Sequence, residues 1–315
     1  MTGGIGKTGI GKDAQLTVVI CTYNRCQLLV DCLASVACQN LDNIEVLVID
    51  NNRSDGTFQV VADTNERKQS IRYVFEDKQG LSHARNRGWL EAAGDIIAYI
   101  DDDAVAAPDW CERIVAAFSS VSPEPAAVGG PIYPLLRSAP PWWFVPELET
   151  RTWGEQAQFL EPSAALYGFS GSNMTFKRQV LADAGGFNPE YGMQGHVARM
   201  GEESELFARL FRDGARLWYD PAIRVSHHVP SSQLRLSGRI RRAFLSGSAR
   251  QSMTGARMPF SHVRREAVGL LRMMTAFYRS NIGFSYFLVS TMDAIANRSG
   301  YLLTGLGKAV YGKPK

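Results

Sequence analysis

Residues 95–103 read DIIAYIDDD, an apolar run that ends in three consecutive aspartates. If the run is a buried strand, Asp101, Asp102 and Asp103 all lie at its end, where their mutual repulsion disfavours the cluster unless a cation binds. Hard oxygen ligands suit Mg²⁺ or Mn²⁺, and one or two carboxylates that leave room for phosphate oxygens commonly hold either ion. The alternative is a solvated loop whose aspartates cap the helix expected after Pro108.

Short apolar runs alternate with amphipathic stretches on both sides of this segment. Helices are predicted after Asn24, from Ser54 or Asp55, over 82–93 with Gly94 as the stop, and after Pro108. Strands that are apolar throughout and separated by helices predict an α/β fold with a mostly parallel sheet covered on both faces. The predicted strands are LTVVIC (16–21), IEVLVID (44–50), IRYVF (71–75), DIIAYI (95–100) and AAVGG (126–130).

The composition changes after Pro131. Residues 134–147, PLLRSAPPWWFVPE, fit no regular element and predict a long loop over the site or an acceptor-side insertion. Regular structure is then expected again, with a short helix that ends at Gly185 and Gly186. The further predicted elements are SGSNMTF (170–176), a helix in GEESELFARLFRDG (201–214), and strands in RLWY (216–219) and IRVSHH (223–228).

Charge is distributed unevenly along the 315 residues. Residues 231–315 contain fourteen Lys and Arg and two acidic residues, a net +12, whereas residues 1–230 carry a net −9. We therefore predict a flexible leader over 1–14, a catalytic domain over 15–230 and a basic amphipathic helical region over 231–315. The GKT of the leader lacks the earlier glycine and the strand that a phosphate-binding loop needs.

The N-terminus and the cysteines favour an intracellular protein. No charged segment followed by an apolar one marks a secretory signal. Four of five cysteines crowd into residues 21–38 without a CxxC pair or a neighbouring histidine, which is typical of buried, reduced thiols. We expect a cytoplasmic location.

Polar residues follow three of the predicted parallel strands. Thr22, Tyr23 and Asn24 end the first strand, residues 50–52 (Asp-Asn-Asn) end the second, and the aspartates of 101–103 end the fourth. Ligands bind at the carboxyl ends of strands in parallel α/β sheets, so these three groups are expected at one edge of the sheet.

Six strings in order resemble the family 2 glycosyltransferases, which have the GT-A fold. The resemblance covers about residues 16–228 and implies transfer of a sugar from a nucleotide diphosphate donor to an acceptor hydroxyl, with inversion. The strings are VVICTYNR, EVLVIDNNRSDGT, GLSHARNRG, DIIAYIDDDAVAAPDW, SGSNMTFKR with GGFNPEYG, and GEESELFARL.

The resemblance assigns donor-side roles residue by residue. Asn51 stands where the family often has an aspartate that contacts uracil; an amide both donates and accepts, so the choice among uridine, guanosine and thymidine is open, with UDP-sugars favoured. Asp103 corresponds to the direct ligand of Mn²⁺ or Mg²⁺, with Asp101 and His227 as further ligands, although His227 could equally be satisfied within a turn. The donor-binding residues implied are Cys21, Thr22, Tyr23, Asn51, Arg85, Asn86, Asp101 and Asp102.

On the acceptor side, the resemblance implies that Glu203, or its neighbour Glu202, removes the proton of the attacking hydroxyl. Glutamates at a helix start also suit the helix dipole without any catalytic role. Trp142, Trp143 and Trp153 are candidates for stacking on acceptor sugars, and Asn173 for an acceptor contact, with packing as the competing role of the tryptophans.

The expected acceptor is a glycan or a lipid-linked glycan. The arginine-rich 231–315 region is interpreted as contacting an anionic membrane surface peripherally, or a lipid-linked pyrophosphate, rather than nucleic acid. A sugar-nucleotide pyrophosphorylase would need a glycine-rich loop after the first strand, and a haloacid-dehalogenase-type phosphatase would place its aspartates there. A catalytically degenerate binding protein is the remaining alternative.

Overall fold

The computed structural model describes residues 14–39, 43–67, 71–161, 168–193, 201–254 and 284–311. The predicted leader therefore lies outside the described residues, apart from residue 14. The chain forms two compact units. The first contains residues up to Tyr133 together with Thr150–Val197 and Glu202–His227, and the second contains Pro134–Glu149, Ala198–Gly201 and His228–Lys315.

The first unit is built on a mixed sheet with the strand order β3-β2-β1-β4-β9-β6-β10-β8. Strands β3, β2, β1 and β4 are parallel to one another, as the sequence predicts, whereas β9 runs antiparallel between β4 and β6. The strands are β1 (Leu16–Thr22), β2 (Ile44–Asp50), β3 (Ile71–Phe75), β4 (Ile96–Asp101), β6 (Ala127–Gly129), β8 (Gln158–Phe159), β9 (Met174–Lys177) and β10 (Leu217–Tyr219).

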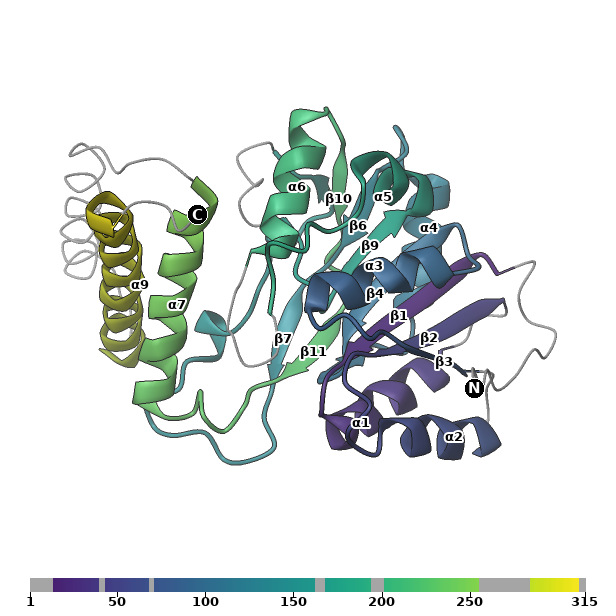
Figure 1. Cartoon of the computed structure of the whole chain (residues 1–315), viewed down its shortest axis with the longest axis horizontal. Coiled ribbons are helices and arrows are strands. Elements are labelled where there is room, and N and C mark those ends of the chain that lie inside the picture. The colour runs from purple at the N-terminus through teal and green to yellow at the C-terminus, as the bar shows by residue number, and fades with distance from the viewer. Residues whose placement is uncertain are drawn as a thin grey trace. The chain divides into compact units, whose positions relative to one another are not determined.

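Helices cover both faces of this sheet because its strands bury apolar side chains on both faces. In β1, Val18 and Ile20 belong to one core cluster and Val19 to the other, which is the two-residue alternation of a strand. The first core includes residues of α1 (Cys26–Ala37), α2 (Thr57–Arg67) and α4 (Trp110–Ser120); the second includes residues of α3 (Leu81–Glu91), α5 (Arg178–Ala184) and α6 (Glu202–Arg212). Figure 1 shows α1 and α2 on one side of β1 and β2, and α3 on the other.

A second, three-stranded sheet has the order β5-β11-β7, with β5 at Ala104–Ala106, β11 at Val225–His228 and β7 at Ile132–Leu135. Strand β5 was not predicted, and β7 with the short helix η1 (Pro146–Leu148) gives regular structure to part of the segment predicted as a loop. The β11–β5 pairing is antiparallel and places His227 opposite Ala104.

Two glycines show why helix ends cannot be assigned from glycine alone. Gly185 adopts φ +72° at the end of α5, as predicted for a C-cap. Helix α3 instead ends at Glu91, before Gly94, and a Cβ on Gly94 would lie 2.8 Å from the backbone of Leu16. Gly94 therefore allows close approach to β1 rather than ending the helix.

The second unit contains two long helices, α7 (Leu236–Thr254) and α9 (Phe284–Tyr311), which pack side by side (Figure 1). None of the helices in the described ranges is long and apolar enough to cross a membrane. All five cysteines are free thiols, and Cys38 is exposed although buried thiols were expected.

Candidate active site

The three predicted polar strand ends do meet at one edge of the main sheet. Strand β1 pairs with both β2 and β4, so Thr22 lies opposite Asp50 and Cys21 lies opposite Asp101. The residues that follow β1, β2 and β4 therefore lie next to one another at the carboxyl ends of these strands. This part of the site follows directly from the parallel order of β2, β1 and β4.

Asp101, Asp103 and His227 form a group whose potential ligand atoms all lie within 4.8 Å of one another. Nε2 of His227 is 3.0 Å from Oδ1 of Asp103 and 3.8 Å from Oδ2 of Asp101. The pairing of His227 with Ala104, directly after Asp103, brings the histidine to the aspartates across more than 120 residues of sequence. The three residues predicted as metal ligands are thus neighbours.

The donor set of this group fits a divalent cation. Oδ1 of Asp103 is buried and accepts no well-aligned hydrogen bond from a described residue, although the His227 ring is close. Burial alone would lower the pKa of His227 and raise that of Asp103, but the attraction between the two outweighs burial, so the pKa of His227 is raised and that of Asp103 lowered. Two carboxylates and one imidazole are suitable ligands for Mn²⁺.

Asp102 does not take the donor-binding role expected from the resemblance. Its side chain is completely buried, accepts a hydrogen bond from Thr22 Oγ1 at 2.7 Å and pairs with Nη2 of Arg25 at 2.7 Å. Burial raises its pKa to about 7. The middle aspartate therefore anchors the end of β4 to the end of β1, and Arg25, which sequence reasoning did not single out, also bonds Asp103 at 2.9 Å.

Arg85 joins the aspartate group to the two candidate bases. Its buried guanidinium contacts Glu202 at 2.9 Å, Glu203 at 3.2 Å and Asp101 at 3.6 Å. Burial would lower the pKa of Arg85, but the Glu203, Glu202 and Asp101 carboxylates outweigh it and raise the pKa. The guanidinium is thus an anchored positive charge between the candidate metal group and the start of α6.

The two glutamates differ in accessibility. Glu202 is 4 % exposed, and burial together with its neighbour Glu203 raises its pKa. The Glu203 side chain is 24 % exposed, and its Oε1 also accepts the backbone N–H of Gly171 at 3.0 Å. Glu203 is therefore both held in place and open to a substrate.

The loop before β9 completes the site with two residues that were not predicted individually. Ser172 donates a hydrogen bond to Asp101, while Gly171 donates its backbone N–H to Glu203. A Cβ at Gly171 would lie 1.9 Å from Nη2 of Arg85, so only glycine permits this approach. Both residues belong to the string SGSNMTF, and this string was the signal that could have identified them.

A cavity of about 390 Å³ opens at the carboxyl ends of β1 and β2. Volumes of a few hundred Å³ are typical of small-molecule sites. Cys21, Thr22 and Tyr23, all predicted to surround the donor, line it. The other lining residues are Asn24, Arg25, Asn51, Leu81, Ala84 and Met193.

Asn51 lines this cavity, but its amide is largely committed to the chain. Nδ2 donates to the carbonyl oxygens of Glu76 and Lys78 at 3.0 and 2.8 Å, and Oδ1 accepts the N–H of Gly80 at 2.7 Å. Both amide protons are used, so the predicted donation to a base is not available in this arrangement. Asn51 instead positions the loop between β3 and α3.

Asn86 is hydrogen-bonded to the turn after α5. Its Nδ2 donates to the carbonyl of Phe187 at 2.7 Å, and its Oδ1 accepts from the Phe187 N–H at 2.8 Å and from Trp89 Nε1 at 3.2 Å. Gly186 lies directly against this amide. The Asn86 side chain therefore holds the turn after α5, and its contact with the donor stays a prediction.

Asn173, predicted on the acceptor side, is completely buried. Its Oδ1 accepts from Trp110 Nε1 at 2.9 Å, and its Nδ2 donates to the carbonyls of Pro131 and Ile223 at 3.2 and 2.8 Å. A fully bonded, inaccessible amide cannot contact an acceptor. Asn173 links α4 to the chain before β7 and β11.

Of the three tryptophans predicted to stack on acceptor sugars, Trp142 and Trp143 lie in the second unit and differ in exposure. Trp143 is only 6 % exposed, so its ring is packed and unavailable for stacking. Trp142 is 72 % exposed. Trp153, in the first unit, packs against the second core cluster and donates Nε1–H to the carbonyl of Gly168 at 3.1 Å.

Comparisons with known proteins identify the family of this chain. Residues 17–185, more than half of the chain, match the family model described as glycosyl transferase family 2. The glucosyl-dolichyl phosphate glucuronosyltransferase of Haloferax volcanii is 26 % identical over 242 residues, which cover 76 % of this chain and 77 % of that protein.

Solved structures show the same fold at lower identity. The mannosyltransferase PcManGT of Pyrobaculum calidifontis, in complex with GDP-Man and Mn²⁺, superposes with a TM-score of 0.54 at 19 % identity, covering 98 % of this chain and 80 % of that one. GalNAc-T7 with UDP, GalNAc and Mn²⁺ has a TM-score of 0.55 at 17 % identity, covering 80 % and 53 %. The chain belongs to glycosyl transferase family 2 and is a glycosyltransferase with the GT-A fold.

Proposed function

We propose that the enzyme transfers a sugar from a nucleotide diphosphate donor, with a UDP-sugar favoured, to an acceptor hydroxyl with inversion at the anomeric carbon. The observation that carries this proposal is one continuous arrangement: Arg85 contacts both Asp101, which forms a group with Asp103 and His227, and Glu203. A donor diphosphate needs a positively charged partner, whereas an acceptor hydroxyl needs a group that takes its proton. A cation at Asp101, Asp103 and His227 would be the first, and the Glu203 carboxylate would be the second.

The donor nucleotide would occupy the cavity lined by Cys21, Thr22 and Tyr23. Tyr23 accepts a hydrogen bond from Gln79 at 3.0 Å, which keeps its ring at the cavity wall, where it can stack on a base. The diphosphate would then extend toward the end of β4. The solved relatives bound to GDP-Man and UDP support a nucleotide diphosphate here.

Asp101, Asp103 and His227 would hold Mn²⁺ or Mg²⁺, and the bound ion would supply charge stabilisation for the departing diphosphate. The protein's own contribution is to keep these ligands in position. Ser172 holds Asp101, Arg25 holds Asp103, and the β5–β11 pairing holds His227. Fixed ligands of this kind reduce the reorganisation needed when charge develops.

Glu203 would accept the proton of the acceptor hydroxyl as that oxygen attacks the anomeric carbon. Its Oε1 is held by Gly171 and Arg85, and its partial exposure leaves the carboxylate open to an acceptor. Glu202 pairs with Arg85 and is buried, which suits a residue that positions the guanidinium. We therefore assign the base to Glu203 rather than Glu202.

The acceptor would be a glycan or a lipid-linked glycan in surface or other polysaccharide synthesis. The Haloferax volcanii relative acts on a glucosyl-dolichyl phosphate, and a Campylobacter jejuni relative, 33 % identical over 91 residues, is a GalNAc(5)-diNAcBac-PP-undecaprenol beta-1,3-glucosyltransferase. We propose that residues 15–230 catalyse transfer. Residues 231–315 would contact the acceptor or an anionic membrane from the cytoplasmic side.

Two substitutions in the first turn of α6 test whether Glu203 is the catalytic base. Glu203→Gln removes the proton acceptor while keeping size and hydrogen bonding, so transfer should fall by about 10²- to 10⁴-fold. Glu205→Gln is the control, because Glu205 lies in the same first turn of α6 but pairs with Arg209. UDP affinity, measured by calorimetry, should stay unchanged in both.

The same preparation tests metal dependence and stereochemistry. Chelation with EDTA should abolish transfer and added Mn²⁺ should restore it, and proton NMR of the product should show the inverted anomer. Equal transfer rates in Glu203→Gln and Glu205→Gln would exclude Glu203 as the base. Retention of configuration would contradict the single-displacement mechanism.

A further inference from the structure

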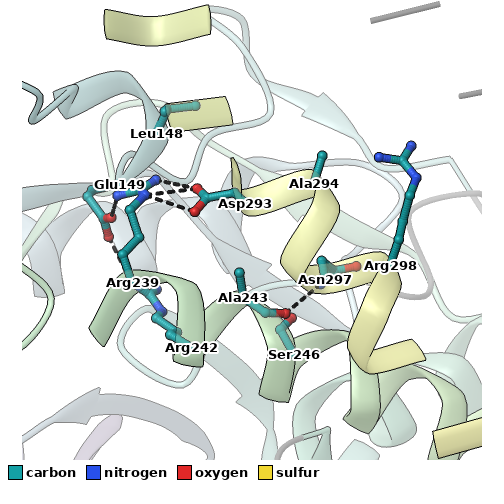
Figure 2. A pocket seen from close by; sticks show the side chains of 10 residues that line it. All are labelled: Leu148, Glu149, Arg239, Arg242, Ala243, Ser246, Asp293, Ala294, Asn297 and Arg298. Carbon is teal, nitrogen blue, oxygen red and sulfur yellow. Dashed lines mark hydrogen bonds and ion pairs between the residues drawn. The ribbon is translucent and has the colours of Figure 1, made fainter. Parts of the chain in front are cut away.

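The C-terminal unit contains a second cavity, of about 370 Å³, between α7 and α9. Figure 2 shows it from close by. It is lined by polar and charged side chains from α7, from α9 and from the end of the 134–149 segment. Those used below are Glu149, Arg239, Arg242, Ser246, Asp293 and Asn297.

The packing of the two helices explains where this cavity opens. At Gly247 and Gly300 the backbones are in close contact, since a Cβ at either glycine would lie 2.0 Å or less from a carbonyl oxygen of the other helix. Ser248 and Thr304 hydrogen-bond nearby at 2.7 Å. The cavity adjoins this close contact, since Ser246, next to Gly247, and Asn297, whose carbonyl oxygen faces Gly247, are among its lining residues.

Four of the charged residues that line the cavity form ion pairs with one another. Arg239 is 6 % exposed and donates from Nε and Nη2 to Asp293 at 2.6–3.0 Å, and from Nη1 to Glu149 (Figure 2). Arg242 bonds Glu149 at 2.8 Å through its Nη1. The two carboxylates are thus paired with two arginines.

Arg242, Ser246 and Asn297 leave unused hydrogen-bond donors in the cavity, beside the Asn297 amide oxygen and the Ser246 hydroxyl oxygen, which can accept. Among the described residues, Nε and Nη2 of Arg242 and the hydroxyl of Ser246 have no partner, and Asn297 uses one amide proton on the carbonyl of Ala243. Arg242 and Ser246 are four residues apart on α7, so they lie on the same side of that helix. A phosphate oxyanion accepts hydrogen bonds from such donors, and a guanidinium binds it by a charge-assisted pair of bonds.

We propose that this cavity binds the phosphate group of a phosphorylated ligand. Arg242 would supply two parallel N–H donors to the phosphate oxygens, and Ser246 and Asn297 would supply neutral donors. The Arg239 network would keep Glu149 and Asp293 from repelling the anion. Identification of that group with the phosphate of a lipid-linked acceptor rests on the proposed function; the phosphate site itself does not.

Calorimetric titration of the full-length protein tests the proposal, with UDP and Mn²⁺ present throughout to occupy the donor cavity. The probes are inorganic phosphate, citronellyl phosphate, the unphosphorylated alcohol citronellol and a methyl glycoside. Both phosphates should bind and both neutral probes should not. Tighter binding of citronellyl phosphate would identify a lipid phosphate as the source, and equal binding would identify free phosphate.

Variants locate the binding. Ser246→Asp places a negative charge among the donors and should abolish phosphate binding, Arg242→Gln should weaken it about tenfold or more, and Ser246→Ala about threefold. Arg241→Gln is the control, because Arg241 is exposed and does not line the cavity. Phosphate affinity unchanged by Ser246→Asp, Ser246→Ala and Arg242→Gln, or no phosphate binding at all, would overturn the proposal. Because none of these readouts is sugar transfer, failure of the proposed function would be seen separately.

Discussion

At the scale of single residues, Arg85 is the side chain on which the rest of the site depends. It is 2 % exposed and contacts three carboxylates from β4 and α6. A buried charge is tolerated only when its partners are in place, and removal of one partner typically costs about 3–5 kcal/mol. The positions of Glu203 and Asp101 are therefore coupled through one guanidinium.

Gly171 allows the loop before β9 to reach this guanidinium, which makes Gly171→Ala an informative variant. The new Cβ would lie 1.9 Å from Arg85 Nη2 and 2.7 Å from Glu203 Oε1, so the side chains must shift. We expect a loss of about 1–3 kcal/mol in the free energy of unfolding and on the order of a 100-fold fall in transfer rate. Denaturant titration and an activity assay measure the two effects.

Gly56→Ala is the matched control for that variant. A Cβ at Gly56 would meet only Cys26 Sγ at 3.6 Å, an ordinary contact, so stability and activity should stay near wild type. Full activity in Gly171→Ala would show that the loop can move away without disturbing Arg85 and Glu203.

The residue scale also shows where prediction from sequence is limited. The strand ends at Thr22, Asp50 and Asp101 could be predicted because they follow from strand periodicity. The directions of the Asp102 and Asn173 side chains could not, since both depend on partners distant in sequence, such as Arg25 for Asp102 and Ile223 for Asn173. The sequence pattern of a strand predicts which residues lie at the end of that strand. Whether their side chains point into the candidate site depends on tertiary packing.

At the scale of elements, the loop before α2 supports two helices at once. The N-cap residue of α1, Arg25, makes no side-chain capping bond, and Asp55 Oδ2 accepts the N–H of Cys26 at 3.0 Å instead. Asp55 Oδ1 accepts the N–H and hydroxyl of Thr57 at 3.1 and 2.6 Å, at the start of α2. One carboxylate therefore satisfies backbone donors of both helices.

This geometry predicts a pH-dependent stability. Burial would raise the pKa of Asp55, but the bonds from Thr57 and Cys26 outweigh it and lower the pKa. A carboxyl whose folded-state pKa is depressed stabilises the fold above its unfolded pKa of about 4, and this contribution is lost as pH falls through the folded value. Asp55→Asn should therefore cost about 1 kcal/mol at pH 7 and progressively less as pH falls below about 4.

Urea unfolding at pH 7 and pH 3 measures this difference. Asp63→Asn is the control, because Asp63 lies on α2 and accepts a hydrogen bond from the exposed Gln59. A destabilisation by Asp55→Asn that is the same at both pH values would show that the ionised carboxylate is not what supports the two helices.

Most elements could be predicted, and the exceptions have a common cause. Helix α1 buries Leu29, Cys32, Leu33 and Val36, the positions that its periodicity indicates. The element SGSNMTF, which contains β9, could be predicted, but its antiparallel pairing with β4 and β6 could not, and strand β5, three residues long, depends on its pairing with β11. Short strands that depend on distant partners carry too little local pattern to be recognised.

At the scale of the whole molecule, the uneven charge predicts how the protein meets a surface. Residues 231–315 carry a net +12, and anionic membranes attract basic segments by about 1 kcal/mol per charge near the surface. The protein should sediment with phosphatidylglycerol vesicles at low salt and dissociate as salt increases. Equal sedimentation with neutral phosphatidylcholine vesicles, or none with either, would contradict this expectation.

The central claim is that this chain turns over a nucleotide diphosphate sugar with a metal held at Asp101, Asp103 and His227. The most direct measurement is nucleotide diphosphate release from a panel of UDP-, GDP- and dTDP-sugars with Mn²⁺, with Asp103→Ala as the test variant and Asp109→Ala, a partly exposed aspartate paired with Arg113, as the control. The account predicts release from one nucleotide class, UDP foremost, that requires metal, is lost in Asp103→Ala and is retained in Asp109→Ala. Absence of binding and turnover with every donor, or turnover unaffected by chelation and by Asp103→Ala, would contradict it.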